Sequence, residues 1–221
     1  MKRPNSILWF LLILSLPFFL IFTSVRILFN PFFLNFEYNQ PGFPVDTYGF
    51  TTADRIKWGN YSLEYLFNSA DPSFLQIKMD NGQVLYNDRE LSHMVDVKNL
   101  VQVMQKIWIG VGVLYILFAL YAWRSHDFSG FWKGVMRGGW LTNALIVILV
   151  VFIFIGFNDL FTNFHHLFFQ GDSWLFAYSD TLIRLFPLQL WQDAFLYAGI
   201  LTAVLSILCI FGGRAFARRF E

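Results

Sequence analysis

Charged residues are scarce in this chain. They make up 14% of its 221 residues, whereas hydrophobic residues make up 56%. About a quarter of a typical soluble domain is charged, so this composition excludes an ordinary soluble protein of this length. The formal net charge is only +1, which gives no indication of nucleic-acid binding. The single cysteine, Cys209, cannot form an intrachain disulfide, and nothing indicates redox chemistry.

Long apolar runs dominate the sequence instead. Crossing a hydrocarbon core of roughly 30 Å takes about 20 helical residues, and three runs approach that length: Ile107–Trp123, Leu141–Phe157 and Ala194–Gly212. A fourth run, Ile7–Phe29, follows Lys2 and Arg3 as a secretory signal would. It is longer than the usual signal core of about 7–15 residues, and no small-x-small cleavage site closes it. We therefore predict an uncleaved first helix and four transmembrane helices.

Basic residues flank these runs on one side of the membrane. The three groups are Lys2 with Arg3, Arg124 with Lys133 and Arg137, and Arg214 with Arg218 and Arg219. Because cytoplasmic flanks carry the excess of Lys and Arg, both termini of this multi-pass membrane protein are predicted to be cytoplasmic. The predicted layout is transmembrane helix 1 at 1–30, an extracytoplasmic domain at 31–104, transmembrane helix 2 at 105–123, a cytoplasmic loop at 124–139, transmembrane helix 3 at 140–157, an extracytoplasmic loop at 158–193, transmembrane helix 4 at 194–213 and a cytoplasmic tail at 214–221.

The segment 31–104 is predicted to be a small α+β domain with a short β-sheet between helices 1 and 2. In "FLQIKMDNGQVLYN", apolar and polar residues alternate before Asn81-Gly82, and Val84, Leu85 and Tyr86 follow. Asn-Gly between β-rich runs is a strong hairpin signal, because both central residues need positive φ. The fold class predicted for the whole chain is thus an α-helical membrane protein with an added α+β domain.

The rest of the segment 31–104 is predicted to contain one loop region and two helices. The stretch "NPFFLNFEYNQPGFPVDTYGF" is rich in Pro, Gly and aromatic residues and is predicted to form an ordered loop with short extended pieces. "TTADRIKWGNYSLEYLF" is predicted to be helical with Thr52 as its N-cap. "NDRELSHMVDVKNLVQVMQKIW" lacks Gly and Pro, and is predicted to start at Asn87-Asp88 and to continue into the second transmembrane helix.

Histidines occur on both predicted sides of the membrane. His126 is predicted to be cytoplasmic, whereas His93, His165 and His166 are predicted to be extracytoplasmic. Histidine is the natural proton-transfer group near neutral pH. Because adjacent helical residues point about 100° apart, at most one of His165 and His166 is expected to face a shared site.

Two neighbours of His93 are expected to support it. Residues three or four apart share a helix face, so Arg89 and Asp96 lie within side-chain reach of His93. Arg26 lies near the outer end of the first helix. In a structural role it would extend to lipid phosphates or pair with Asp159; in a functional role it would hold a lipid head group or stabilise the site.

Two other interpretations of the histidines compete with a role in proton transfer. Aromatic belts are normal at membrane interfaces, and a histidine among them is often only a hydrogen-bonded, wetted group. A zinc site built from the outer histidines with Asp96 or Asp172 is the second, but no compact H-E-x-x-H spacing is present. We therefore predict no metal site and no cofactor.

Two histidine motifs carry a resemblance to a known family. "NDRELSHMVDVKNL" and "FHHLFFQGDSWLF", separated by two membrane helices and preceded by "FNPFFLNFEYNQPGF", resemble the integral membrane family that includes the bacterial lipoprotein intramolecular transacylase, Lit. The likeness covers essentially the whole chain. On these motifs the resemblance implies that His93 and His165 are the catalytic histidines, while His166 falls at a variable position.

The resemblance also implies a reaction and a partner. Enzymes of this family move an acyl chain from the diacylglyceryl group of a lipoprotein's N-terminal cysteine onto the α-amino group of that cysteine. The implied partners are therefore bacterial lipoproteins and membrane lipids. Histidine acid/base catalysis fits this reaction, because the substrate's own amine attacks the substrate's own ester. The alternatives are a non-catalytic membrane protein that binds lipid, lipoprotein or a partner, and a metal-dependent membrane hydrolase.

Overall fold

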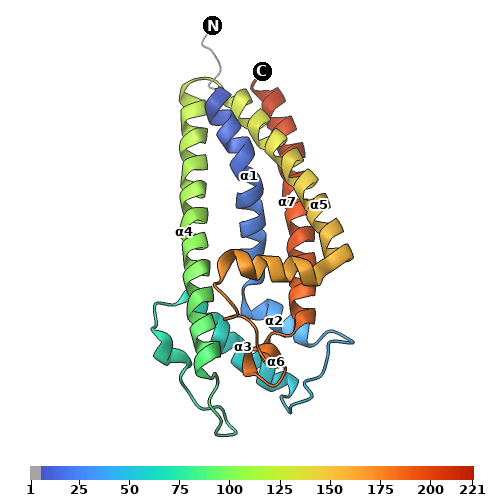
Figure 1. The fold of residues 1–221 in the computed structure, drawn as a ribbon. Helices are drawn as coiled ribbons and strands as arrows, with labels where there is room; N and C mark the ends of the chain where they lie inside the picture. Colours follow the sequence, from blue (N-terminus) through green and yellow to red (C-terminus); the bar gives the residue numbers. More distant parts are fainter. Residues whose placement is uncertain (1–5) are drawn as a thin grey trace. The chain divides into compact units, whose positions relative to one another are not determined.

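The computed structural model describes residues 6–221, so the predicted flanking charges Lys2 and Arg3 lie outside the described residues. Helices make up all of the regular structure in that range. In chain order they are α1 (Ser6–Leu28), α2 (Pro31–Tyr38), α3 (Thr52–Phe67), the 3₁₀ helix η1 (Pro72–Leu75), α4 (Asp88–Arg124), α5 (Phe128–Phe168), α6 (Thr181–Leu185) and α7 (Leu188–Arg219), as Figure 1 shows.

Four of these helices are long and apolar enough to cross a membrane, namely α1, α4, α5 and α7. α4 is one continuous helix of 37 residues, as predicted for the segment that begins near Asn87 and continues into the second apolar run. α5 is not continuous in the same way. Its backbone leaves helical geometry at Gly156 (φ −162°, ψ 65°), so residues 157–168 form a separate helical arm. Asp159 lies in the first turn of this arm, where a carboxylate stabilises a helix.

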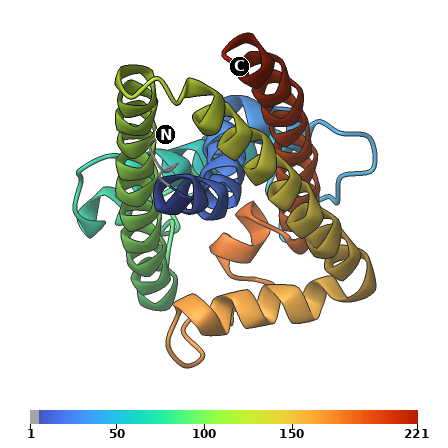
Figure 2. The ribbon, with the colours of Figure 1, turned by 90° about the horizontal axis from the view of Figure 1, so that it is seen from above.

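The chain divides into two compact units. The first contains the described residues up to Ile27 together with Gln105–Ile155 and Leu196–Glu221. Within this unit, α1 lies between α4 and α7 (Figures 1 and 2). Trp108 of α4 donates to Thr23 of α1 (3.0 Å), and Thr202 of α7 donates to Ser24 of α1 (2.9 Å). Such side-chain hydrogen bonds are suited to helix association in lipid.

Two glycines allow α5 and α7 to approach closely in the first unit. A Cβ at Gly139 of α5 would lie 2.8 Å from the Ser206 carbonyl oxygen, and one at Gly213 of α7 would lie 2.8 Å from the Trp132 carbonyl oxygen. Any larger side chain would push the backbones apart. Small residues at helix contacts are the expected solution where lipid removes the hydrophobic drive for association.

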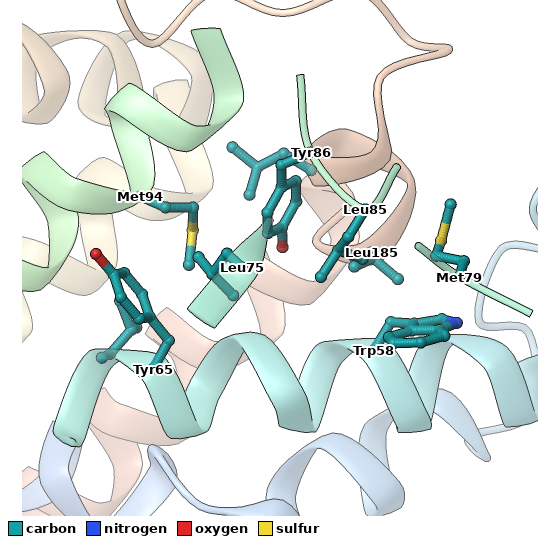
Figure 3. Close-up of a cluster of buried hydrophobic side chains, with 10 residues drawn as sticks. Trp58, Tyr65, Leu75, Met79, Leu85, Tyr86, Met94 and Leu185 are labelled. Atoms are coloured by element: carbon teal, nitrogen blue, oxygen red, sulfur yellow. The ribbon is translucent and has the colours of Figure 1, made fainter. Parts of the chain in front are cut away.

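The second unit contains Leu28–Met104 and Gly156–Phe195, and it has its own hydrophobic core. Leu75, Leu85 and Leu185 are fully buried in that core. Figure 3 shows Trp58 and Tyr65 projecting from α3 toward these leucines. The core therefore joins α3, the chain on either side of the Asn81-Gly82 turn, the start of α4, and α6.

The predicted β-sheet is wrong. The Asn81-Gly82 turn does form, with Gly82 at φ +82°, but a single bridge between Lys78 and Val84 is all that follows from it. No strand is present in residues 6–221. The physical reason is length: only 12 residues separate η1 from α4, and an isolated two-stranded hairpin needs a third strand or extensive packing to persist. Here the alternating apolar side chains enter a core built by helices.

The loop predicted after the first helix is also wrong at its start. Residues Pro31–Tyr38 form α2, with Asn30 accepting from the backbone N–H groups of Phe32 (2.8 Å) and Phe33 (3.2 Å). Asn at the N-cap followed by Pro at the first helical position was the available signal. The N-cap of α3 is Thr51 rather than Thr52.

α2 buries an acidic side chain. Glu37 is 1% exposed, and burial, together with the hydrogen bond and the charge of Asp193, raises the pKa of Glu37 to about 7. A carboxyl group whose pKa rises on folding is held protonated over a pH range in which the unfolded chain ionises. Unfolding then releases a proton, so raising the pH between 4.5 and 7 favours the unfolded state.

Replacing Glu37 with Gln should remove this pH dependence. The melting temperature of the parent protein should fall relative to that of Glu37→Gln as the pH rises from 5 to 8, because only the parent must ionise a buried carboxyl. Thermal unfolding in detergent, followed by intrinsic fluorescence, measures the difference. Glu64→Gln, at an exposed glutamate of α3, is the matched control and should parallel the parent. Parallel curves for Glu37→Gln as well would contradict a protonated Glu37.

Candidate functional site

The first turns of α4 begin the site. Asn87 caps the helix by accepting from the backbone N–H groups of Arg89 and Glu90, both at 3.0 Å. Glu90 in return accepts from the Asn87 N–H at 2.9 Å. This reciprocal arrangement is a capping box, which fixes where the helix begins. It thereby fixes His93, one turn further along.

Glu90 also holds the start of α6. Its other carboxylate oxygen accepts from the Leu182 N–H at 2.6 Å. The first N–H groups of a helix lack partners within the helix, and the N-cap residue Asp180 supplies no side-chain cap. Glu90 is 2% exposed, and burial raises its pKa although both backbone hydrogen bonds oppose the shift. One buried carboxyl group thus connects two helices beside His93.

The second histidine comes from the arm of α5 that follows Gly156. Nδ1 of His165 lies 2.7 Å from the carbonyl oxygen of Phe161. A carbonyl oxygen only accepts, so Nδ1 carries the proton in this hydrogen bond, and Nε2 of the neutral ring is left as an acceptor. His166 is exposed and packs edge-on against Trp174. Both adjacent histidines therefore contact the Trp174 ring, but His166 is exposed and His165 is partly buried.

His93 and His165 lie beside each other. Their ring centroids are 6.2 Å apart and the ring planes are inclined by 20°. Phe169 and Phe176 contact the His93 ring at 4.8 and 5.3 Å, and Trp174 contacts the His165 ring at 4.7 Å. Both imidazoles, from segments 72 positions apart in the sequence, are thus enclosed by the same aromatic wall.

Burial controls the charge of this pair. His93 is 6% exposed, and both histidines belong to the second unit, outside the apolar runs predicted to cross the membrane. Burial, with a smaller effect from the charge of His165, lowers the pKa of His93 to about 4. Burial also lowers the pKa of His165, although the Phe161 carbonyl opposes the shift. Both rings are therefore favoured in their neutral forms near pH 7.

Arg89 and Asp96 differ in their relation to His93. The Arg89 guanidinium donates to the Asp172 carbonyl oxygen at 2.8 Å and lies over the Phe176 ring. Arg89 therefore holds the loop that forms the aromatic wall. Asp96 is exposed, and Nδ1 of His93 is buried without a hydrogen-bond partner. Asp96 therefore does not hydrogen-bond Nδ1 of His93, and its supporting role stays a prediction.

The remaining predicted residues lie elsewhere. Arg26 is the basic residue in the last turn of α1 and belongs to the first unit. His126 lies in the turn between α4 and α5 with φ +58° and belongs to the first unit as well. Arg184 of α6 lies four residues after Asp180, the N-cap of that helix, but its ion pair is with Asp46, at 2.9 Å.

The loop after α5 adds polar atoms that the sequence did not single out. Oγ of Ser173 and Nε1 of Trp174 are buried and, like Nδ1 of His93, have no hydrogen-bond partner within the protein. Buried polar atoms are normally paired. The sequence does not single out Trp174, because an indole in an aromatic-rich stretch gives no sign of where its N–H points.

No group of three or more His, Cys, Asp or Glu side chains is arranged to hold a metal ion within residues 6–221. What these residues do build is a pair of imidazoles favoured in their neutral forms, His93 buried and His165 partly buried, with aromatic rings around them. Taken with the four apolar helices, this defines an integral membrane protein that holds two histidine rings side by side.

Comparison with known proteins identifies the family. The family model described as "Lipoprotein intramolecular transacylase Lit" matches residues 10–191. The chain is also 31% identical over 211 residues to an uncharacterized protein of Aquifex aeolicus (strain VF5), an alignment that covers 92% of this chain and 91% of the relative. The chain therefore belongs to the lipoprotein intramolecular transacylase Lit family and is a bacterial membrane protein.

Solved structures share the fold. The membrane-integral lipoprotein intramolecular transacylase Lit from Bacillus cereus superposes with a TM-score of 0.82 at 19% identity, covering 99% of this chain and 98% of that one. Two variants of the same protein, with one histidine replaced by arginine or alanine, give TM-scores of 0.75 and 0.74, also at 19% identity. They cover 97% of this chain and 92% and 94% of theirs. At this identity the likeness is one of fold.

The low pKa of His93 is directly measurable. Titration of histidine-labelled protein by NMR should show one imidazole with a pKa of about 4, and this signal should disappear in His93→Gln. In His165→Gln the pKa of His93 should rise, because the neighbouring charge that lowers it is gone. His166→Gln, at the exposed neighbour, should leave it unchanged. A value of 6.5 or above for His93 would contradict a buried, neutral imidazole.

Proposed function

We propose that this chain is a lipoprotein intramolecular transacylase. It moves an acyl chain from the diacylglyceryl group of a lipoprotein's N-terminal cysteine to the α-amino group of that cysteine, producing the lyso form. The observation that carries the proposal is the buried pair of His93 and His165 within an aromatic enclosure. Membership in the Lit family supports the choice of reaction.

The first step needs a base. The neutral α-amino nitrogen attacks the ester carbonyl carbon, a C–N bond forms, and the carbonyl electron pair moves to oxygen. Nε2 of His165 accepts the ammonium proton of this adduct, because the Phe161 carbonyl holds the ring in the Nδ1–H tautomer. The attacking amine and the ester belong to one substrate molecule, so proximity is supplied by the substrate itself.

The second step needs an acid and a stabilised oxyanion. The tetrahedral adduct collapses when its C–O bond to glycerol breaks, and the departing oxygen takes the proton that His165 had accepted. The products are an amide and a free hydroxyl group, so protons balance. His93, neutral and buried, polarises the reacting carbonyl or its leaving oxygen, and the unpaired Nε1 of Trp174 donates to the oxyanion. Arg89 positions the loop that carries Trp174.

The location of the substrate sets the orientation. Lipoproteins carry their lipid at the outer leaflet of the cytoplasmic membrane, so the second unit must face the extracytoplasmic side and both termini the cytoplasm. The basic residues that flank the apolar runs at Arg124, Lys133 and Arg137 support this orientation.

Each histidine of the pair should be essential. His93→Ala or His165→Ala should abolish lyso-lipoprotein formation, because the first removes the ring that polarises the reacting group and the second removes the ring that carries the proton. His166→Ala should have a smaller effect, and His126→Ala should be silent. The assay expresses each variant in a lipoprotein-bearing bacterium that lacks its own N-acylating enzymes and analyses lipoprotein N-termini by mass spectrometry.

The outcomes separate the competing functions. Full turnover with either His93→Ala or His165→Ala, at normal expression, would exclude the mechanism. An unchanged diacylglyceryl form with the parent chain would favour a non-catalytic protein that binds lipid or lipoprotein. Turnover that a chelator abolishes would favour a metal-dependent enzyme. Equal losses of turnover for His165→Ala and His166→Ala would mean that the catalytic role assigned to His165 does not belong to His165 alone.

Trp174→Phe tests the oxyanion donor separately. The phenyl ring keeps the contact with His165 but lacks the N–H, so turnover should fall on the order of 100-fold, the size of effect seen when one such donor is lost. The same mass-spectrometric assay, read as a rate, measures it. Trp140→Phe, at an exposed tryptophan of α5 in the first unit, is the control. Equal rates for the parent and Trp174→Phe would remove Trp174 from the mechanism.

A further inference from the structure

A pocket lies in the second unit, and neither His93 nor His165 lines it. Its volume is about 520 Å³, within the range of small-ligand sites. The walls come from the end of α3, the segment that follows it, and the middle of α4. The polar residues that line it are Asn68, Ser69, Lys98, Asn99 and Gln102. No residue of the proposed catalytic site belongs to this lining.

Lys98 is the centre of this pocket. It is 7% exposed, and its Nζ donates to Oδ1 of Asn68 (3.2 Å) and to the carbonyl oxygen of Ala70. The same atom lies 3.9 Å from the centroid of the Tyr65 ring. All three partners are neutral. A buried ammonium group is costly unless an opposite charge compensates it.

No carboxylate forms an ion pair with Lys98. Within residues 6–221, Lys57 pairs with Asp80, Lys133 with Glu221 and Arg184 with Asp46, so these three carboxylates serve other cations. Asp71 acts on Lys98 only at longer range, and it opposes the lowering of the Lys98 pKa that burial causes. Lys98 is the charged residue of the pocket lining, and its single positive charge matches an anion with one negative charge.

Amide and hydroxyl groups complete the polar lining. Gln102 binds the Asn68 carbonyl oxygen through its Nε2 at 3.1 Å, and the Asn68 side chain accepts from the Ala70 N–H at 3.0 Å. These bonds leave the Nδ2 groups of Asn68 and Asn99 as donors. A cation surrounded by amide donors matches the oxygens of a phosphate group.

The pocket also lies at the depth of lipid head groups. α4 is one continuous helix, and Lys98 precedes the predicted membrane-spanning run at 105–123 by seven residues, or about 10 Å. The head-group layer extends roughly 5–8 Å beyond the hydrocarbon core on each side. Lys98 therefore lies about 2–5 Å beyond that layer along the helix axis, close enough for the phosphate of a lipid to enter the pocket.

We propose that this pocket binds the phosphodiester group of a membrane phospholipid, with Lys98 as the charged contact and the Asn68 and Asn99 amides as donors. The ligand carries one negative charge, which matches the single charge of Lys98 in the lining. The site is distinct from the transacylase site and does not depend on the reaction proposed for it. Its ligand is a lipid of the surrounding leaflet.

Lipid binding to the full chain in detergent tests the proposal by native mass spectrometry. Phosphatidylglycerol should bind at least about tenfold more tightly than diacylglycerol, which has the same chains and no phosphate, since a charge-assisted contact is worth about one power of ten. Lys98→Met should remove this preference, and Lys98→Arg should retain most of it. Lys106→Met, at an exposed lysine two turns further along the same helix, is the matched control and should bind as the parent does.

Three results would overturn the proposal. One is an equal loss of binding in Lys98→Met and Lys106→Met, which would indicate general attraction to basic residues. Another is displacement of phosphatidylglycerol by glycerol 3-phosphate at equal concentration, which would indicate a soluble phosphate ligand. The third comes from Asn99→Trp, a variant that fills the pocket and keeps Lys98, and that serves if Lys98→Met fails to fold. Unchanged lipid binding by Asn99→Trp would exclude the pocket as the binding site. A loss of binding of about tenfold would support it.

Discussion

The carboxyl group of Glu90 is the contact on which the rest of the second unit depends. It closes the capping box with Asn87 and supplies the hydrogen bond that α6 lacks at its own N-terminus. A side chain that does both must be buried, and burial raises the free energy of its ionised form. The hydrogen bonds offset that cost. Because His93 follows Glu90 by three residues, the same contact determines which way His93 faces.

The arrangement around the two histidines combines rigidity with low polarity. His93 is fixed by a capped helix and His165 by its bond to the Phe161 carbonyl, so neither ring must reorganise to meet a substrate. Aromatic rings contact both imidazoles, and burial favours their neutral forms, the state from which the proposed mechanism has His165 accept a proton and later return it. An acyl chain is also compatible with this wall, since its methylenes lose nothing by leaving the bilayer for a surface of Phe and Trp side chains.

The sequence predicted those parts of the structure that rest on local patterns. The apolar runs predicted four helices of membrane-spanning length, and Asn87 predicted the start of α4. The two histidine motifs predicted the pair His93 and His165, which the fold brings together. The prediction of a β-sheet was wrong because the Asn-Gly pattern indicates only the turn at residues 79–85. The conformation of the flanking residues depends on the helical core that Leu75 and Leu85 enter. The site's buried polar atoms, such as Nε1 of Trp174, depend on distant contacts and leave no local pattern.

The interruption of α5 at Gly156 has a consequence for the thickness of the bilayer. Residues 128–155 form about 42 Å of regular helix before it, at 1.5 Å per residue. Lipid tails cannot hydrogen-bond backbone groups that such a break exposes, so Gly156 is a costly position for the interior of a bilayer. We therefore expect the hydrocarbon to end before Gly156. A change in bilayer thickness would then be absorbed at the opposite end of α5, near Phe128.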